Sequence, residues 1–554
     1  MKLSLDWLSD FVTFTMKDPE KIAKAITAHT AEVEEVKVQG ALLEQCCIGK
    51  VLSIEKHPNA DRLNVCEVQT DKGKKRVVCG GTNLRVGMRV AFAHSGANLK
   101  SHDGEPMRLQ KVTIRGVESD GMICAAIELD LQESFPPTPE QGARPVMDFG
   151  DGTEGVGTSL AAYLGLGDVV LHIDNHAITH RADLFSHIGF ARECVAIGIA
   201  KWKKKPSTIN HKPMNFSKIP IPFRFIVDEP RLMPRYCACT IHIDALGETP
   251  GWMKKRLEAV GFRSINLPID ITNYVASEIG VPLHSFDADD IKGTVHMRTA
   301  KEGEKIVTLD RKEFSLPDGA LILSDDDGIF ALLGIMGGLR SSTKESTRNI
   351  YLHSASLDPV SIRRTVIATG HRTDAATVYE KGVPHITTEQ GFLRALQLFL
   401  ELVPGARVTS KLESKGDNGK TKPITLDVAH VHSMLGIAIP EKKIVKILTD
   451  LECTVKTPRR GVLMITPPLH RLGDLRGPHD LIEEIGRIYG YDAITEALPV
   501  ASIAPPAREM RIHQMRDILK EHGYYELLPL SLLGPDALKK VEMILHTPLQ
   551  SVIP

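Results

Sequence analysis

Residues 471–492 read RLGDLRGPHDLIEEIGRIYGYD, and this stretch predicts a helix over Pro478–Tyr489. Proline suits the first turn of a helix, and Leu481, Ile485 and Ile488 recur at helical spacing on one face. The charged residues lie on or beside the other face, or in the loop before it: Asp474, Asp480, Glu483, Glu484 and Arg487. The four acids are either carboxylates that stabilise the positive end of the helix dipole or oxygen ligands for a hard cation such as Mg²⁺. The residues alone favour the first interpretation.

Further elements surround that helix. Another helix is predicted over 441–451 and a strand over 461–465, so residues 421–498 form a compact α+β unit. After residue 505 a new amphipathic helix begins near Met510, and the sequence stops about 45 residues later, which is short for a mixed domain.

Residues 211–405 alternate predicted strands and helices, as in an α/β or α+β domain. Glycines that permit close backbone approach occur there together with polar side chains that offer hydrogen bonds: Gly334, Gly337, Gly338, Thr272, Asn273, His284, Thr373 and Asp374. Such groups fit a polar pocket for a small ligand. Each of them, taken alone, is more often structural.

Residues 39–150 consist of short β-rich runs, which predict a small barrel. Residues 66–70 and 76–78 flank a polar turn that contains Gly73, the pattern of a hairpin. From Lys50 to Arg115 there are 13 Lys/Arg and 6 Asp/Glu residues, whereas residues 116–150 hold 1 basic and 7 acidic residues. A basic barrel is a common support for a phosphate backbone, but the same cluster is equally compatible with solvated surface.

The composition is that of a multidomain globular protein. The 554 residues are 42% hydrophobic and 25% charged, and the formal net charge of −1 gives no overall attraction to nucleic acid or membrane. Nine cysteines without a closely spaced framework favour a reducing compartment, and no apolar run reaches the roughly 18 residues of a membrane span. We expect a soluble cytoplasmic protein that has no membrane partner.

Smaller motifs are expected to be structural. Cys237 with Cys239, His176 with His180, and His430 with His432 have the wrong spacing for a tetrahedral zinc site. His94-Ser95-Gly96 and His284-Ser285 lack a recognisable third partner for a nucleophilic triad. The sequence also contains no phosphate-binding G-x-x-x-x-G-K-[ST] loop.

An ordered series of short motifs crosses the barrel segment: His57-Pro58-Asn59-Ala60-Asp61-Arg62-Leu63, Val77–Gly80, Asn83, Val86–Met88 and Arg115–Cys124. This series resembles the oligonucleotide-fold (OB-fold) tRNA-binding module found in several tRNA-handling proteins. The resemblance implies tRNA binding by residues 39–150, through His57, Asn59, Asp61, Arg62, Lys74, Lys75, Arg76 and Arg115.

The string D-L-I-E-E-I-x-R-I-Y-G-Y-D, with a further Asp six residues before its first Asp, resembles the β subunit of bacterial phenylalanyl-tRNA synthetase. The resemblance runs from MKLSLDWLSDFV at the start, through HRADLFSHIGFARE (180–193), to YDAITEALP (491–499). In that family the four matching acids are assigned to a Mg²⁺ site shared with the α subunit. They correspond here to Asp474, Asp480, Glu483 and Glu484.

The same resemblance implies an editing domain that hydrolyses tRNA carrying tyrosine instead of phenylalanine. Its pocket is implied to contain Thr272, Asn273, His284, Gly334, Gly337, His353, Thr373 and Ala375. One position departs from the family, because Leu352-His353 stands where Leu-Glu is usual. Neutral imidazole accepts one hydrogen bond where a carboxylate accepts several, so we expect weakened or altered editing.

The resemblance also implies the reaction and its partners. The expected activity is ATP-dependent attachment of phenylalanine to tRNA(Phe), in an α₂β₂ heterotetramer whose α subunit binds ATP. This chain would supply assembly and tRNA contacts, the Mg²⁺ carboxylates and editing. Two alternatives are a free-standing tRNA-binding or trans-editing protein without an α partner, and a scaffold that has lost both functions.

The expected fold is multidomain α+β. An OB-fold barrel is inserted in a small α/β N-terminal domain, and an α/β editing domain of the B3/B4 type follows it. A small α+β domain resembling DNA-binding domains (B5 type) follows, and then the start of a catalytic-like synthetase domain. Chains of the family continue beyond this point, so the sequence is either a fragment or a naturally short protein, and we expect a fragment. The expected boundaries are 1–38 plus 151–207, 39–150, 211–405, 421–498 and 499–554.

Overall fold

The computed structural model describes residues 1–101, 104–132, 135–136, 144–174, 176–205, 216–496, 498 and 510–528. The chain divides into two compact units, Met1–Ile494 and Thr495–Pro554. Helix α13 (Met510–Glu521) is the described element of the second unit and confirms the helix expected near Met510. The expected boundary near residue 207 lies outside the described residues, as does most of 499–554.

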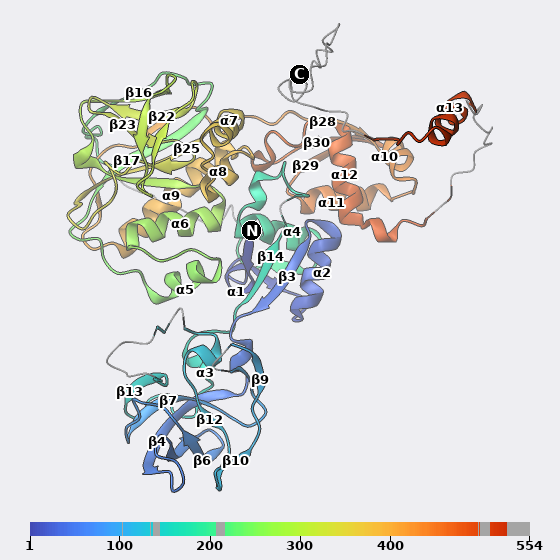
Figure 1. Cartoon of the computed structure of the whole chain (residues 1–554). Coiled ribbons are helices and arrows are strands. Elements are labelled where there is room, and N and C mark those ends of the chain that lie inside the picture. Colours follow the sequence, from blue (N-terminus) through green and yellow to red (C-terminus); the bar gives the residue numbers. More distant parts are fainter. Residues whose placement is uncertain are drawn as a thin grey trace. The chain divides into compact units, whose positions relative to one another are not determined.

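A small antiparallel sheet is built from segments that come before and after the barrel in the sequence (Figure 1). Strand β14 (Val169–Ile173) pairs with both β1 (Lys2–Ser4) and β3 (Val33–Val38). The helices of this region are α1 (Leu5–Leu8), α2 (Pro19–His29) and α4 (His187–Ala196), and strand β2 (Val12–Phe14) pairs with β15 (Ala200–Trp202). Helix α3 (Leu160–Tyr163) packs instead against the barrel strand β4. The chain therefore leaves this sheet after β3 and returns to it at β14.

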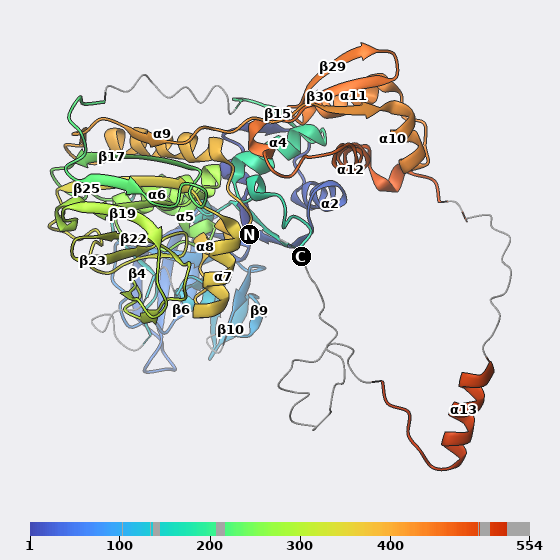
Figure 2. The same cartoon turned by 90° about the horizontal axis from the view of Figure 1, so that it is seen from above.

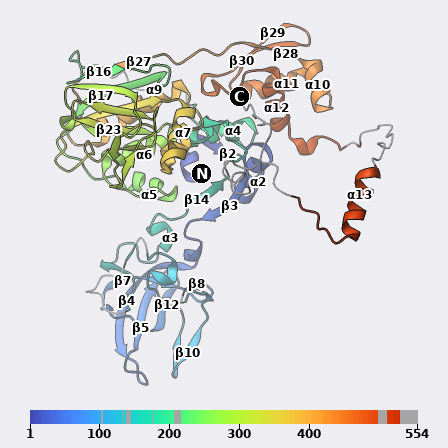
Figure 3. The ribbon, with the colours of Figure 1, turned by 45° about the horizontal axis from the view of Figure 1, so that its top comes forward.

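The barrel segment contains a six-stranded antiparallel sheet in the order β12-β7-β4-β5-β6, with β13 paired to β7 (Figure 3). Its strands are β4 (Cys46–Lys56), β5 (Asn64–Thr70), β6 (Gly73–Cys79), β7 (Met88–Ala93), β12 (Met122–Ile123) and β13 (Asp148–Asp151). Two short hairpins accompany it: β8 (Asn98–Lys100) with β9 (Pro106–Arg108), and β10 (Val112–Ile114) with β11 (Val117–Ser119). The predicted hairpin is confirmed as β5–β6, with a tighter turn than expected.

Two five-stranded sheets follow. One has the order β16-β19-β22-β23-β24, and the other β18-β25-β17-β26 with β27 paired to β17. Their strands are β16 (Arg224–Val227), β17 (Arg235–His242), β18 (Leu283–Asp287), β19 (Thr294–Thr299), β22 (Leu321–Asp325), β23 (Gly328–Leu332), β24 (Met336–Gly337), β25 (Asn349–Ser356), β26 (Arg407–Val408) and β27 (Glu413–Lys415). A separate hairpin joins β20 (Lys305–Val307) to β21 (Glu313–Ser315).

Helices α6 and α9 pack against each other and against strands of the second sheet, as Figure 2 shows from above. The helices of this region are α5 (Gly251–Ala259), α6 (Leu267–Ile279), α7 (Pro359–Thr369), α8 (Asp374–Tyr379) and α9 (His385–Leu402). Aromatic rings from both sheets meet in the core: Phe225 lies 4.7 Å from Tyr236 and Phe286 lies 5.4 Å from Phe330, measured between ring centroids. The two sheets therefore share one apolar interior.

A small domain with a three-stranded sheet and three helices contains residues 471–492. Its elements are β28 (Ile424–Asp427), β29 (Thr454–Arg459), β30 (Val462–Thr466), α10 (Val428–Leu435), α11 (Glu441–Asp450) and α12 (Pro478–Tyr489). Helix α12 has the predicted bounds, and Leu481, Ile482 and Ile485 are buried in this core. The predicted polar face is wrong in part, because Glu484 and Arg487 are also buried, at 2% and 9% exposure.

All nine cysteines are free and buried, in agreement with the absence of a disulfide framework from the sequence. In the described part of the chain, no helix has both the length and the apolar character needed to cross a membrane.

Candidate functional site

The Glu484 carboxylate of α12 is enclosed by arginines. Arg471, in the loop before the helix, donates from Nη1 and Nη2 to the two carboxylate oxygens, each at 3.0 Å. Arg487, one turn further along α12, donates from Nε at 2.9 Å and from Nη2 at 2.5 Å. Although burial favours the neutral acid, these arginines hold the pKa of Glu484 well below its ordinary value.

The same ion network reaches the N-terminal sheet region. Arg487 donates to both oxygens of Glu193 in α4, at 2.5 and 3.1 Å. Arg181 joins Glu193 at 2.8 Å and holds Asp183 through two hydrogen bonds of 2.9 and 2.8 Å. Buried charges are stable only when they are paired and hydrogen-bonded. The network therefore ties α4 to α12, which are almost 300 residues apart in sequence.

The four predicted magnesium carboxylates are not brought together. Asp474 accepts from Arg471 Nε at 2.6 Å, and Asp480 accepts from the backbone amides of Arg476 and Gly477 at 2.7 and 2.8 Å. The side chain of Glu483 is exposed. Within the described residues, no three of these acids place oxygens within 4.8 Å of one another.

In this arrangement the Glu484 carboxylate is not free to bind Mg²⁺. The ion takes carboxylate oxygens that are free to bind it, and both oxygens of Glu484 already accept from guanidinium groups. Burial raises the pKa of Asp474, and Arg471 offsets that rise only in part. We therefore derive no chemical step that passes through a magnesium ion on this chain.

Two histidines of the predicted editing pocket are neighbours across a sheet. His284 on β18 lies directly opposite His353 on β25. The His353 side chain is 1% exposed, and its ring lies 5.9 Å from the rings of both Tyr236 and Tyr351. Desolvation lowers the pKa of His353 to about 3 and that of His284 to about 4, so both imidazoles are neutral.

This cluster contains several buried polar atoms that lack partners. In the described part of the chain, neither ring nitrogen of His353 has a hydrogen-bond partner, nor do His284 Nε2 and the hydroxyls of Tyr236 and Tyr351. Buried polar groups are normally paired, so an unpaired set of this size indicates a place where a ligand or water binds. The sequence did not identify Tyr236 and Tyr351, because neither tyrosine lies in a recognisable motif.

The turn at Gly334–Gly338 and Thr373, both part of the predicted pocket, are in contact. Thr373 caps helix α8, accepting from the Ala376 amide, and its hydroxyl donates to the Ile335 carbonyl at 2.8 Å. Gly334 has φ +71°, and a Cβ there would lie 2.6 Å from Ile362. The glycine is therefore required by backbone conformation and by close packing.

The remaining predicted pocket residues are less distinctive. Thr272 is buried in α6, where its hydroxyl donates to the Ile269 carbonyl at 2.7 Å. This bond within one helix gives Thr272 a structural role. Asn273 and Ala375 are half-buried on α6 and α8, and Gly337 lies in β24.

In the barrel, His57, Asn59 and Arg115 form a local structure. His57 is 5% exposed; its Nε2 donates to the Ile114 carbonyl at 3.0 Å and its Nδ1 accepts from the Asn59 amide. Asn59 and Arg115 exchange two hydrogen bonds between side chain and backbone. These bonds hold the 57–63 loop against the β10–β11 turn, so His57 has a structural role, and its contact with tRNA stays a prediction.

The basic residues of the barrel differ in how free their side chains are to contact a phosphate backbone. Lys75 donates to Asp120 at 2.6 Å and is partly buried, and Lys74 lies 3.2 Å from Glu67. Arg76 is exposed on β6, and Asp61 and Arg62 are exposed in the preceding loop. Arg62, Arg76 and Arg115 are therefore better placed to meet a phosphate backbone than Lys75.

Comparisons with known proteins agree with this organisation. Three family models match in order: a tRNA binding domain over residues 46–148, a B3/4 domain over 232–404 and a tRNA synthetase B5 domain over 424–491. The phenylalanine–tRNA ligase beta subunit of Pseudomonas savastanoi pv. phaseolicola is 34% identical over 97% of this chain and 65% of its own length. That of Synechocystis sp. is 34% identical over 99% of this chain and 68% of its own length. This chain belongs to the family of phenylalanine–tRNA ligase beta subunits.

The family expected from the sequence is thus confirmed. The beta subunit of Psychrobacter arcticus is 35% identical over 96% of this chain, and here too the chain spans 65% of the relative's length. A solved N-terminal fragment of the phenylalanyl-tRNA synthetase beta subunit of Pyrococcus horikoshii aligns at 17% identity. It covers 59% of this chain and 88% of that chain with a TM-score of 0.31, which is too low to support any argument.

One cluster of side chains in this chain was not predicted from the sequence. His94 has no recognisable partner in the sequence, but the structure places Asp71 Oδ1 at 2.6 Å and Cys47 Sγ at 3.7 Å from its Nε2. The three residues are separated by 23 and 24 positions, a spacing that matches no motif. The expectation that His94 belongs to no nucleophilic triad is not contradicted, because both neighbours approach the same ring nitrogen.

Proposed function

We propose that this chain is the beta-subunit part of an enzyme that attaches phenylalanine to tRNA(Phe) in an ATP-dependent reaction. The observation that carries the proposal is 34% identity to phenylalanine–tRNA ligase beta subunits over almost the whole chain. The ordered tRNA binding, B3/4 and B5 matches support it. ATP is assigned to the α subunit by analogy with the family, and the absence of a phosphate-binding loop from this sequence agrees with that assignment.

The proposal requires an α subunit, in the α₂β₂ assembly of the family, and a cytoplasmic location. Co-expression of this chain with an α subunit from the same genome tests it. A stoichiometric complex that charges tRNA(Phe) with phenylalanine is expected, whereas either chain alone is expected to be inactive. Failure of the two chains to co-purify would overturn the assignment.

tRNA contact is assigned to the barrel. Three exposed cations of the barrel segment are Arg62 in the 57–63 loop, Arg76 on β6 and Arg115 in the β10–β11 turn. Electrostatic attraction to phosphates supplies most non-specific affinity. Lys74 and Lys75 already have acidic neighbours. We therefore assign the main contribution to the three arginines.

Editing of tyrosyl-tRNA(Phe) is assigned to the cluster around His284 and His353. Unpaired hydroxyls and imidazole nitrogens in a buried aromatic setting are groups that could bind a phenolic side chain. A site selects a hydroxyl-bearing substrate most strongly when its own polar groups pair with that hydroxyl. Neutral His353 offers one acceptor and one donor, so we expect weaker recognition of tyrosine than a carboxylate would give.

A further inference from the structure

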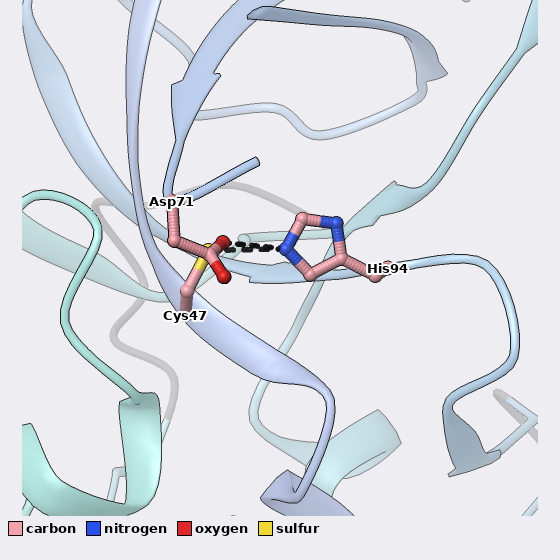
Figure 4. A group of neighbouring side chains, drawn as sticks. All are labelled: Cys47, Asp71 and His94. Carbon is pink, nitrogen blue, oxygen red and sulfur yellow. Dashed lines mark hydrogen bonds and ion pairs between the residues drawn. The ribbon is translucent and has the colours of Figure 1, made fainter. Parts of the chain in front are cut away.

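Three side chains from separate parts of the barrel sheet converge at one point (Figure 4). Cys47 lies on β4, Asp71 in the β5–β6 turn, and His94 directly after β7. His94 Nε2 lies 2.6 Å from Asp71 Oδ1 and 3.7 Å from Cys47 Sγ. The three atoms all lie within 4.8 Å of one another.

The sheet fixes the positions of these residues. Strand β4 pairs with β7 on one side, where Cys47 is opposite Phe92, and with β5 on the other. Cys47 and His94 are 2% and 4% exposed, so both are held by packing. The side chain of Asp71 is 37% exposed, which leaves one side of the cluster open to solvent.

The geometry is not that of a catalytic relay. In a nucleophile–histidine–acid relay, the imidazole uses one nitrogen for the nucleophile and the other for the acid. Here the thiol and the carboxylate both approach Nε2. One ring nitrogen has either one proton or one lone pair, so it pairs with one of these neighbours, and the Asp71 carboxylate also accepts a hydrogen bond from the Cys47 thiol. A cation at the centre could be bound by all three side chains at once.

We propose that Cys47, Asp71 and His94 bind a zinc ion, with water as the fourth ligand. Tetrahedral zinc with bonds of about 2.3 Å to sulfur and about 2.0 Å to nitrogen or oxygen puts sulfur and nitrogen about 3.5 Å apart and nitrogen and oxygen about 3.3 Å apart. The sulfur–nitrogen distance here is 3.7 Å, close to that value. The oxygen must withdraw by less than 1 Å, roughly the reach of a side-chain rotation at the exposed Asp71.

The ligand types select the ion. A thiolate with an imidazole favours Zn²⁺ over Mg²⁺ or Ca²⁺, which prefer oxygen ligands alone. When zinc binds, the Cys47 thiol releases its proton to solvent and the thiolate sulfur bonds to the metal. The bound ion would join the β5–β6 turn to β4 and to the end of β7.

Cobalt substitution tests the proposal on the full 554-residue chain. The protein is purified with a thiol reductant, freed of metal with a chelator and titrated with Co²⁺. We expect one Co²⁺ per chain, with a thiolate-to-cobalt charge-transfer absorption band that Zn²⁺ abolishes by displacing the cobalt. Cys47→Ser and His94→Ala should lose the band, and Asp71→Asn should weaken binding at least ~10-fold.

Cys46→Ser is the matched control. Cys46 is the preceding residue of β4, and its side chain packs in a different apolar cluster from that of Cys47. The control should keep the cobalt band and the wild-type affinity. The proposal is overturned if the folded wild-type chain gives no thiolate band, or if the band persists in Cys47→Ser. Should that variant not fold, Asp71→Asn decides, because its side chain is exposed, and unchanged affinity there overturns the proposal.

Discussion

His284 and His353 are directly opposed residues on the antiparallel strands β18 and β25, and both imidazoles are neutral in the folded chain. Side chains at opposed positions of an antiparallel pair lie on the same face of the sheet. Here His353 lies among Tyr236, Tyr351 and Phe225, and His284 stacks on Phe286. A charge on either ring would be desolvated and would face the other ring, so acid should disfavour this arrangement.

The first prediction concerns the pH dependence of stability. Because the pKa values of His284 and His353, about 4 and 3, lie below the 6.5 of an unfolded histidine, the unfolded chain binds more protons as the pH falls below 6.5. The stability contribution is complete above pH 6.5 and decreases towards pH 4, by about 1.4 kcal/mol per pH unit for each histidine. Urea unfolding of wild type and His353→Phe at pH 5, 6 and 7 measures this.

His353→Phe keeps an aromatic ring but removes one titrating group, so its free energy of unfolding should depend less steeply on pH. Substitution of His430, an exposed residue of α10, by Gln is the control and should keep the wild-type slope. Equal slopes for wild type and His353→Phe would contradict the prediction.

The second prediction concerns editing by the enzyme assembled with its α subunit. His353→Glu should accelerate the deacylation of tyrosyl-tRNA(Phe), because a carboxylate accepts several hydrogen bonds from a substrate hydroxyl where the neutral imidazole accepts one. The measurement is the rate of tyrosine release from preformed tyrosyl-tRNA(Phe), with His430→Glu as control. Rapid wild-type editing that His353→Glu leaves unchanged would show that the histidine has no consequence.

Local pattern was sufficient to predict much of the fold. Helix α12 has the predicted bounds because Pro478 begins it, Gly490 ends it and its apolar residues keep helical spacing. The β5–β6 hairpin was likewise predicted from the β-prone runs on both sides of Gly73. In both cases the residues that decide the element are neighbours in sequence.

The burial of charge was not predictable in this way. Glu484 and Arg487 look like surface residues of an amphipathic helix. They are buried because Arg487 pairs with Glu193, almost 300 residues away, and Glu484 pairs with Arg487 and Arg471. The Cys47, Asp71 and His94 cluster likewise depends on strand pairing and not on a motif. Sequence spacing identifies contacts within one element, whereas these sites combine elements that only the folded chain brings together.

The third prediction concerns tRNA affinity. Arg76→Gln should weaken tRNA binding and lower the slope of log affinity against log salt by about one, because an exposed arginine loses one phosphate contact. Lys75→Gln is the neighbouring comparison and should have the smaller effect, since Lys75 is paired with Asp120. Fluorescence anisotropy with labelled tRNA at several salt concentrations measures both. A larger loss in Lys75→Gln would reverse the assignment.

The fourth prediction concerns magnesium. Since arginines occupy both oxygens of Glu484, adding Mg²⁺ to the metal-free chain should leave its melting temperature unchanged. Differential scanning calorimetry of the chain without its α subunit measures this. A rise in melting temperature with Mg²⁺ that disappears in Glu484→Gln would instead support the four-carboxylate site.

The last prediction concerns the ion network between α4 and α12. Arg487→Met leaves Glu193 and Glu484 with less compensating charge in a buried site, and breaking such a pair costs about 3–5 kcal/mol. Arg476→Met, in the loop before α12 and exposed, is the matched control and should cost no more than about 0.5 kcal/mol. Urea unfolding gives both values.

Arg487→Met combined with Glu193→Gln should recover part of the loss, because the second change removes an unpaired charge. A double variant as unstable as the sum of the two single ones would mean that Arg487 and Glu193 are not coupled, and that α4 and α12 are held together by apolar packing instead.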